Sequence, residues 1–143
     1  LSVRLARHQE SALTVARWLE QRPEVKQVLH PGLPGHPGHA LWRRDFSGSS
    51  GLFSFILQPV PKAAVDAFLD SLELFGLGYS WGGFESLAIP FDCSSYRSAT
   101  TWAPGGPAIR LHIGLEDPAD LLADLDGGFQ TLAAASGAQE PMR

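Results

Sequence analysis

The 143-residue sequence predicts an α+β fold in which helices cover a small, largely antiparallel sheet. Two spacing patterns support this prediction. Apolar residues recur at helical spacing in some segments, whereas short apolar or alternating runs end at glycine or proline in others. The length suits one domain with a substantial core. We therefore expect one domain over 1–143, with strands near 25–29, 51–57, 84–89 and 108–113.

The first half of the chain predicts two helices and two strands. An apolar repeat at seven-residue spacing, which includes Leu5 and Leu19, indicates a helix whose buried face ends before Pro23. Residues 39–46 predict a short helix after a loop rich in proline and glycine. The run at 51–57 is apolar on both alternating sides, so we expect a central strand that is covered on both faces.

The second half begins with the clearest helix of the chain. Pro61 suits a first helical position, and an apolar stripe at i, i+3, i+4 and i+7 follows it. The last helix begins with Asp117 as N-cap and Pro118 as first residue. Gly127 and Gly128 lie inside that helix, where each costs about 1 kcal/mol relative to alanine, so they are expected to permit close packing.

Composition excludes several classes of function. The net charge is −4 and no run of basic residues occurs, so nucleic acid is not an expected partner. Cys93 is the only cysteine, which indicates a reducing, cytoplasmic setting. No apolar stretch approaches the roughly 20 residues that span a bilayer, so no membrane association is expected. Because a helical pattern starts almost at Leu1, we expect a C-terminal piece of a longer protein.

Two motifs predict a binding site for a carboxylate. A glycine-flanked turn within 76–87 presents the Ser80 hydroxyl and the Trp81 indole. The apolar strand within 109–117 carries Arg110, whose planar guanidinium matches the two oxygens of a carboxylate. The sequence therefore places hydrogen-bond donors and a positive charge in two segments that the fold must bring together.

Arg110 also has a simpler interpretation. It could lie on a solvated strand face and pair with Glu85 or Glu116. His36 and His39 could in principle share a metal ion, but no carboxylate or thiolate stands at ligand spacing, so no metal is expected.

The turn also matches Gly-x-Ser-x-Gly, the pattern of an α/β-hydrolase nucleophile. Asp92 and His112 follow Ser80 in the hydrolase order. A nucleophile elbow needs a strand before the serine and a helix after it, whereas here glycines precede Ser80 and a strand pattern follows. A glycine-rich turn without a nucleophile is therefore the expected structure.

Five motifs occur in order between residues 3 and 132. They are Arg-Leu-Ala-Arg-His at 4–8, His-Pro-Gly-Leu-Pro at 30–34, Gly-Ser-Ser-Gly-Leu-Phe-Ser-Phe at 48–55, Tyr-Ser-Trp-Gly-Gly-Phe-Glu-Ser-Leu at 79–87 and Ile-Arg-Leu-His-Ile-Gly-Leu-Glu-Asp at 109–117. Together they resemble the C-terminal domain of the Cys/Met-metabolism enzymes that depend on pyridoxal 5'-phosphate (PLP), which have fold type I. The expected α+β fold with its largely antiparallel sheet rests partly on the spacing patterns and partly on this resemblance. The Tyr-Ser-Trp-Gly-Gly form of the turn points to the cystathionine β-lyase branch, with the γ-synthase and γ-lyase branches as alternatives.

The resemblance implies a role for each residue of the carboxylate site. Arg110 would bind the α-carboxylate of a sulfur amino-acid substrate, and Ser80 and Trp81 would add hydrogen bonds. The implied reaction is a carbon–sulfur lyase β-elimination of methionine biosynthesis, which converts cystathionine to homocysteine, pyruvate and ammonia, with PLP as electron sink. The implied partners are the protein's own large domain and further subunits of a homotetramer. A non-catalytic α+β binding module is the opposing hypothesis.

The resemblance places the cofactor site outside this chain. A PLP enzyme needs a Schiff-base lysine, and the only lysines here are Lys26 on a predicted strand and Lys62 at the start of a predicted surface helix. We expect the large domain with that lysine to precede Leu1, so the isolated chain should neither bind PLP stably nor turn over. Residues 91–107 match no motif, and no role is assigned to them.

Overall fold

The structure is a computed structural model that describes residues 1–137. Within that range it has four helices and four strands, in the order α1 (Ser2–Leu19), β1 (Val25–Leu29), α2 (His39–Asp45), β2 (Leu52–Leu57), α3 (Lys62–Asp70), β3 (Leu87–Phe91), β4 (Ala108–His112) and α4 (Pro118–Gly137). None of these helices has the length and hydropathy that would let it cross a membrane.

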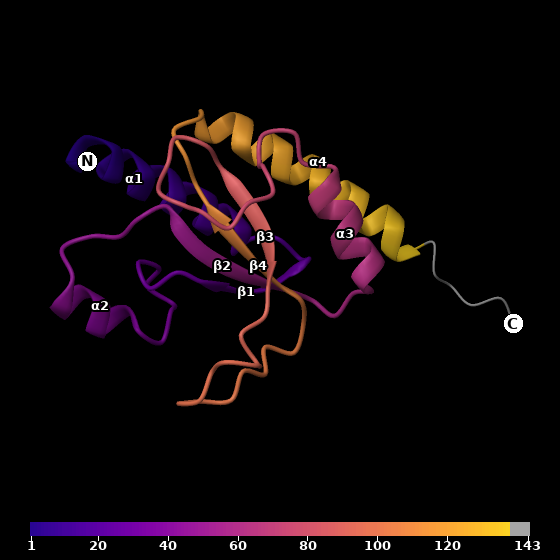
Figure 1. Cartoon of the computed structure of the whole chain (residues 1–143), viewed down its shortest axis with the longest axis horizontal. Helices are drawn as coiled ribbons and strands as arrows, with labels where there is room; N and C mark the ends of the chain where they lie inside the picture. Colours follow the sequence, from indigo (N-terminus) through magenta and orange to yellow (C-terminus); the bar gives the residue numbers. More distant parts are fainter. Residues whose placement is uncertain (138–143) are drawn as a thin grey trace, which may run out of the picture.

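The four strands form one antiparallel sheet in the order β1-β2-β4-β3 (Figure 1). The predicted α+β class is therefore confirmed, and β2 is the predicted inner strand. Phe55 of β2 pairs with Ile109 of β4, while Ser54 pairs with Arg110. Arg110 also pairs with Ile89 of β3, so it occupies the middle of a cross-strand row.

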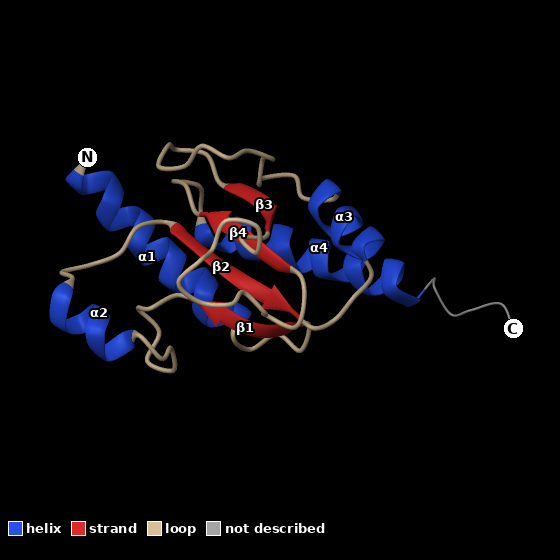
Figure 2. Cartoon of the chain, turned by 60° about the horizontal axis from the view of Figure 1, so that its bottom comes forward, coloured by secondary structure: helices blue, strands red, loops and turns tan. Residues whose placement is uncertain are grey.

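Three helices cover one face of the sheet, where α1 and α4 lie behind the strands in Figure 2. Because neighbouring residues of a strand point to opposite faces, Ile109 and Leu111 of β4 enter this core, whereas Arg110 points to the other face. Phe55 lies 6.5 Å from Phe68 of α3 and 6.2 Å from Phe129 of α4, measured between ring centroids. These apolar contacts fix the position of β4 and hence of Arg110.

Two long connections lie at opposite ends of the β3–β4 pair (Figure 1). The segment after α3, which ends at β3, wraps around the C-terminal end of β4 and the start of β3. The segment 92–107 joins β3 to β4 and projects from the other end of the sheet. The predicted site residues Ser80 and Trp81 lie in the first of these connections.

The predicted strand at 84–89 is displaced toward the C-terminus. Residues 84–86 are outside β3 because their backbone groups bind elsewhere: Leu115 N–H donates to the Phe84 carbonyl at 2.8 Å. The strand instead continues through Pro90 to Phe91. Proline is tolerated there because β3 is an edge strand, where one side of the backbone needs no ladder partner.

Two details of the helices also differ from the predictions. Pro61 is the N-cap of α3 and not its first helical residue, because its ψ of 148° is extended. The side chain of Leu5, which is expected on the buried face of the first helix, is 41% exposed.

The sheet covers only the later part of α1, and there Ala12, Val15, Ala16 and Leu19 are fully buried.

The paired glycines of α4 give a matched test of packing. A methyl group at Gly128 would lie 2.9 Å from Cε2 of Phe68 and 2.9 Å from Cδ2 of Leu72, whereas a methyl group at Gly127 would meet nothing within 4 Å. We expect Gly127→Ala to raise the free energy of unfolding by about 1 kcal/mol through helix propensity. Gly128→Ala should lower it by about 1–3 kcal/mol, because Phe68 is fully buried and cannot move freely. Urea denaturation measures the free energy of unfolding of both variants. Equal changes in the two variants would contradict the expected difference in packing between Gly127 and Gly128.

Candidate functional site

Backbone hydrogen bonds close residues 76–86 into a loop, which we call the 76–86 loop. Gly76 N–H donates to the Ser86 carbonyl at 3.0 Å, and Ala88 N–H donates to the Gly76 carbonyl at 2.9 Å. The two ends therefore meet at the start of β3, and the residues between them form the turn that carries Tyr79, Ser80 and Trp81.

Arg110 contacts this loop directly. Its Nη2 donates to the backbone carbonyl of Tyr79 at 2.7 Å. A guanidinium has five N–H donors, and this is the one hydrogen bond of its side chain that we find within residues 1–137. Arg110 is partly exposed, so its other donors remain accessible next to the turn. The arrangement suits a planar anion such as a carboxylate.

Ser80 and Trp81 are exposed and lie next to the carbonyl that Arg110 binds. Trp81 is 55% exposed, and both residues line a shallow hollow of about 340 Å³ together with Leu77 and Glu85. Arg110 does not line this hollow, but it meets the same turn through the Tyr79 carbonyl, so the three predicted residues lie in one region of the structure. It shows no hydrogen bond from the Ser80 or Trp81 side chain to Arg110.

His112 holds the other side of the turn. Gly82 N–H donates to Nε2 of His112 at 3.2 Å, and the Gly83 carbonyl oxygen lies 3.3 Å from the same nitrogen. Gly82 has a φ of 96°, a conformation that strains residues with a Cβ. A glycine at 82 thus lets the loop turn back toward β4.

The end of the loop is fixed by Ser86 and Glu116. The Glu116 carboxylate accepts from Ser86 N–H at 2.8 Å and from the Ser86 hydroxyl at 2.7 Å. Ser86 Oγ in turn accepts from Gly114 N–H at 2.9 Å. A Cβ at Gly114 would collide with the Phe84 carbonyl oxygen, so this close approach of two backbones requires glycine.

The alternative interpretation of Arg110 as a surface ion pair is wrong. None of the ion pairs within residues 1–137 involves Arg110. Glu116 is occupied by Ser86, and Glu85 lines the hollow instead of contacting the guanidinium. Arg110 is therefore a cation held against a loop without a carboxylate partner among the described residues.

The hydrolase triad does not form. His112 contacts the backbone of Gly82 and Gly83 and not the Ser80 hydroxyl. The Asp92 carboxylate accepts from the backbone and hydroxyl of Ser94, at the other end of the sheet. The structure thus confirms that Ser80 belongs to a glycine-rich turn without a nucleophilic arrangement.

His36 and His39 each have local partners, as expected. His36 Nδ1 accepts from Gly38 N–H at 3.0 Å, and His39 Nδ1 lies 2.8 Å from the Pro31 carbonyl oxygen. In the part of the chain that the structure describes, no group of three or more potential ligand side chains could hold a metal ion.

Comparison with known proteins connects this site to one family. The family described as Cys/Met metabolism PLP-dependent enzyme matches residues 1–130. The chain belongs to this family. It is 52% identical over 138 residues to a putative cystathionine beta-lyase of Rhizobium johnstonii and 50% identical over 133 residues to cystathionine beta-lyase MetC of Escherichia coli. These alignments cover 94% and 90% of the chain, but 35% and 34% of the two relatives.

A solved structure of the same family supports the fold. The crystal structure of cystathionine gamma synthase from Xanthomonas oryzae pv. oryzae in complex with cystathionine superposes with a TM-score of 0.78 at 38% identity. The match covers 94% of this chain and 36% of that chain. The chain therefore spans about a third of the length of the family members that it matches.

Enzymes of the Cys/Met family require PLP, but the residues of this chain do not fit the cofactor. Lys26 donates through Nζ to the backbone carbonyls of Pro104 and Gly105 at 3.0 and 3.3 Å. Lys62 forms an exposed ion pair with Asp66 at 2.6 Å. Both ammonium groups thus have partners on the surface, and neither lines a cavity with Arg110. Neither lysine of this chain is therefore placed to hold the cofactor.

The sequence did not identify the groups that hold the 76–86 loop. From the sequence, His112 is a candidate only for a hydrolase triad, and Glu116 only for an ion pair with Arg110. The structure assigns both to backbone contacts with the loop. One signal is present in the sequence: a histidine and a glutamate, His112 and Glu116, flank an Ile-Gly-Leu segment at the end of the apolar strand that carries Arg110 and just after it.

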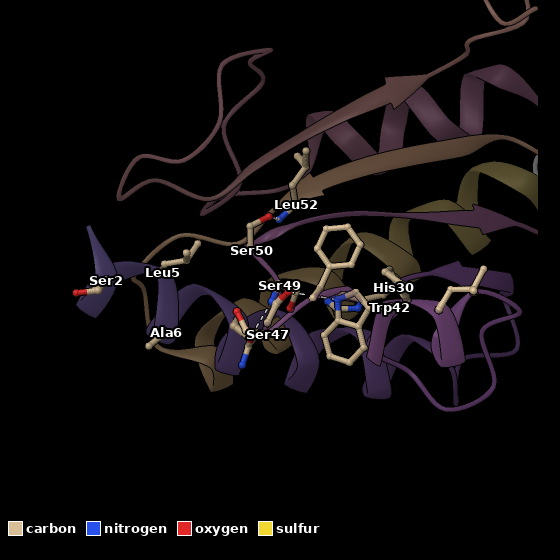
Figure 3. A pocket seen from close by; sticks show the side chains of 15 residues that line it. Ser2, Leu5, Ala6, His30, Trp42, Ser47, Ser49, Ser50 and Leu52 are labelled. Carbon is tan, nitrogen blue, oxygen red and sulfur yellow. Dashed lines mark hydrogen bonds between the residues drawn. The ribbon is translucent and has the colours of Figure 1, made fainter. Parts of the chain in front are cut away.

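A second cavity, of about 870 Å³, lies between α1, α2 and the segment that leads into β2 (Figure 3). Leu5 and Ala6 of α1 and Trp42 of α2 line it, and Trp42 donates through Nε1 to the Gly48 carbonyl at 3.2 Å. Phe46 is 64% exposed at its edge. The cavity is mainly apolar and contains neither Arg110 nor the 76–86 loop.

Three buried histidines predict how stability depends on pH. Burial lowers the pKa of His8, His30 and His112 below the usual value. These side chains therefore bind protons less readily in the folded protein than in the unfolded chain, whose histidines bind protons below about pH 6.5. The contribution of these histidines to the free energy of unfolding is therefore fully present above about pH 6.5, and it is lost as the pH falls below that value. We expect the free energy of unfolding to be lower at pH 5.5 than at pH 7.5.

Urea denaturation at the two pH values tests this expectation. His30 is fully buried and its ring lies 5.4 Å from that of Phe53, so His30→Gln removes one titrating group from the interior. His30→Gln should have a lower free energy of unfolding than the wild type at both pH values. The decrease between pH 7.5 and pH 5.5 should be smaller in the variant than in the wild type. A protein that is more stable at pH 5.5 would contradict the lowered pKa values of the buried histidines.

Proposed function

We propose that this chain is the C-terminal, substrate-carboxylate-binding domain of a PLP-dependent carbon–sulfur lyase of the cystathionine β-lyase branch. The observation that carries the proposal is Arg110, which β4 holds against the Tyr79 carbonyl, next to Ser80 and Trp81 in the chain, and whose other guanidinium N–H donors have no partner among residues 1–137. The family relationship supplies the kind of substrate, a sulfur amino acid.

The chemistry of the site is recognition rather than bond cleavage. A guanidinium binds the two oxygens of a carboxylate through parallel N–H···O bonds, which fix the orientation of the group as well as its position. Ser80 and Trp81 would supply an O–H and an N–H donor at the same end of the substrate. By fixing the α-carboxylate, these residues would orient the α-carbon toward the reacting groups of the large domain.

The branch is proposed on two grounds. Two β-lyase relatives, one of them described as putative, are 52% and 50% identical to this chain, whereas a cystathionine gamma-lyase of Mus musculus is 43% identical over 131 residues. The Tyr-Ser-Trp-Gly-Gly form of the turn is the second ground. The γ-synthase and γ-lyase branches are the alternatives, and their products differ from those of the β-lyase.

The remaining two thirds of the relatives' length would supply the large domain with the Schiff-base lysine. Exposed apolar side chains beside the cavity of Figure 3 support a contact of this kind. Leu41 and Phe46 line this cavity and are 58% and 64% exposed. A cytosolic homotetramer is the assembly that we propose for the full-length enzyme.

Product analysis of the full-length protein with cystathionine tests this function. A β-lyase should release homocysteine, pyruvate and ammonia in equal amounts. A γ-lyase cleaves on the other side of the sulfur and would release cysteine, 2-oxobutyrate and ammonia. Formation of the second set would overturn the branch. Failure to consume cystathionine or related sulfur amino acids would instead support the non-catalytic binding module.

A further inference from the structure

His112 connects Arg110 to the part of the loop that carries the other two site residues. It lies two residues after Arg110, at the C-terminal end of β4, and is 2% exposed. Its Nε2 is 3.2 Å from the Gly82 nitrogen and 3.3 Å from the Gly83 oxygen. Both backbone groups follow Trp81 directly in the chain.

The turn needs such a contact because Ser80 and Trp81 are weakly held themselves. Both are exposed, and we find no hydrogen bond from either side chain within residues 1–137. Arg110 holds Tyr79 on one side of them, and His112 holds Gly82 and Gly83 on the other. The position of Ser80 and Trp81 is therefore set by their neighbours on both sides.

We propose that His112 is a positioning residue for recognition of the substrate carboxylate. Its Nε2 fixes the turn at Gly82–Gly83 and thereby places Ser80 and Trp81 relative to Arg110. This inference rests on the proposed function of Arg110 and extends it to a residue that does not touch the substrate.

The surroundings of His112 favour a rigid neutral ring. His8 of α1 contacts it edge-on, with ring centroids 5.1 Å apart and an interplanar angle of 89°. The charged groups that act on it are Arg110 of β4 and Glu116, which follows β4, while Arg4 of α1 acts on His8. In either neutral tautomer Nε2 keeps one contact with the loop, because it accepts from Gly82 N–H or donates to the Gly83 oxygen.

Two substitutions separate this role from simple packing. His112→Phe keeps an aromatic ring next to His8 but removes the nitrogen that contacts the loop. His112→Gln restores both an acceptor and a donor at comparable reach. In the full-length enzyme we expect the phenylalanine variant to raise KM for cystathionine about tenfold while kcat changes less than about threefold. The glutamine variant should recover most of the lost affinity.

Hydrogen exchange of the full-length enzyme gives a readout that is independent of activity. Amides of the 76–86 loop should exchange faster in His112→Phe than in the wild type, and His112→Gln should restore their protection. His112→Met, which fills the space without a strong acceptor, replaces the phenylalanine variant if that variant does not fold. Lys62→Ala, on the exposed side of α3, is the control and should leave KM and loop exchange unchanged.

The outcomes distinguish this inference from the proposed function. If Arg110→Ala weakens substrate binding but His112→Phe leaves both KM and loop exchange unchanged, the positioning role is wrong and the function of Arg110 stands. An effect on KM without faster loop exchange, or without rescue by glutamine, would likewise overturn the positioning role. If Arg110→Ala has no effect, the proposed carboxylate site itself is wrong.

Discussion

Replacing Arg110 with alanine in the full-length enzyme should lower kcat/KM for cystathionine by about 150-fold, which corresponds to about 3 kcal/mol. The substrate carboxylate would lose its cationic partner, and the 76–86 loop would lose the hydrogen bond to the Tyr79 carbonyl. The fold should persist, because the side chain points away from the core that Ile109 and Leu111 enter. Steady-state kinetics with cystathionine measure the loss.

Arg110→Lys separates charge from geometry. Lysine keeps the positive charge but cannot donate two parallel hydrogen bonds to a carboxylate, so it should recover only a small part of the activity. Arg97→Ala is a matched control because Arg97 is also an exposed arginine with a local hydrogen bond. Its Nε donates to the Thr100 hydroxyl in the 92–107 segment, at the other end of the sheet. Equal losses for Arg97→Ala and Arg110→Ala, or unchanged kinetics for Arg110→Ala, would contradict the assignment.

The isolated 143-residue chain should show no lyase activity and no stable binding of PLP. Neither lysine is placed to form a Schiff base, since Lys26 is bound to the 92–107 segment and Lys62 is paired with Asp66. The full-length protein should show both properties. We therefore expect no lyase activity from the isolated chain and full activity from the full-length protein, which is a larger effect than that of any single substitution described above.

Absorption spectroscopy and borohydride reduction test this contrast directly. After incubation with PLP and removal of the free cofactor, the isolated chain should lack the visible band of a lysine-bound cofactor and should carry no reduced label. Lys26→Arg and Lys62→Arg control for non-specific reaction of exposed amines. A stable band that disappears in one of these variants would place the cofactor lysine in this chain and contradict the proposed division of the enzyme.

The elements that position Arg110 could be predicted from sequence because local patterns determine them. Alternation in Ile109-Arg110-Leu111 indicates a strand with one charged position, and in the structure the two apolar neighbours are fully buried. The antiparallel arrangement is expected partly from the family resemblance, because no short turn joins two of these strands: α2 separates β1 from β2, and α3 separates β2 from β3. The predicted helices, which rest on local patterns, are close to α1, α3 and α4.

The contacts that shape the loop could not be predicted in this way. Residues 84–86 carry a pattern that suits a strand. In the structure, however, Ser86 N–H donates to the Glu116 carboxylate and the Phe84 carbonyl accepts from Leu115 N–H, and both partners are distant in sequence. His112 has no local signal for its partner, because Gly82 is 30 residues away and its amide could bind any acceptor. The sequence indicates which residues have useful chemistry, whereas the tertiary contacts decide which of them meet.

A crystal structure of the full-length enzyme with a non-reacting sulfur amino acid tests the central claim most directly. We predict that the two α-carboxylate oxygens lie about 3 Å from the guanidinium nitrogens of Arg110, within hydrogen-bond range and next to Ser80 and Trp81. A carboxylate that is bound elsewhere, with Arg110 contacting only solvent and the Tyr79 carbonyl, would contradict the account.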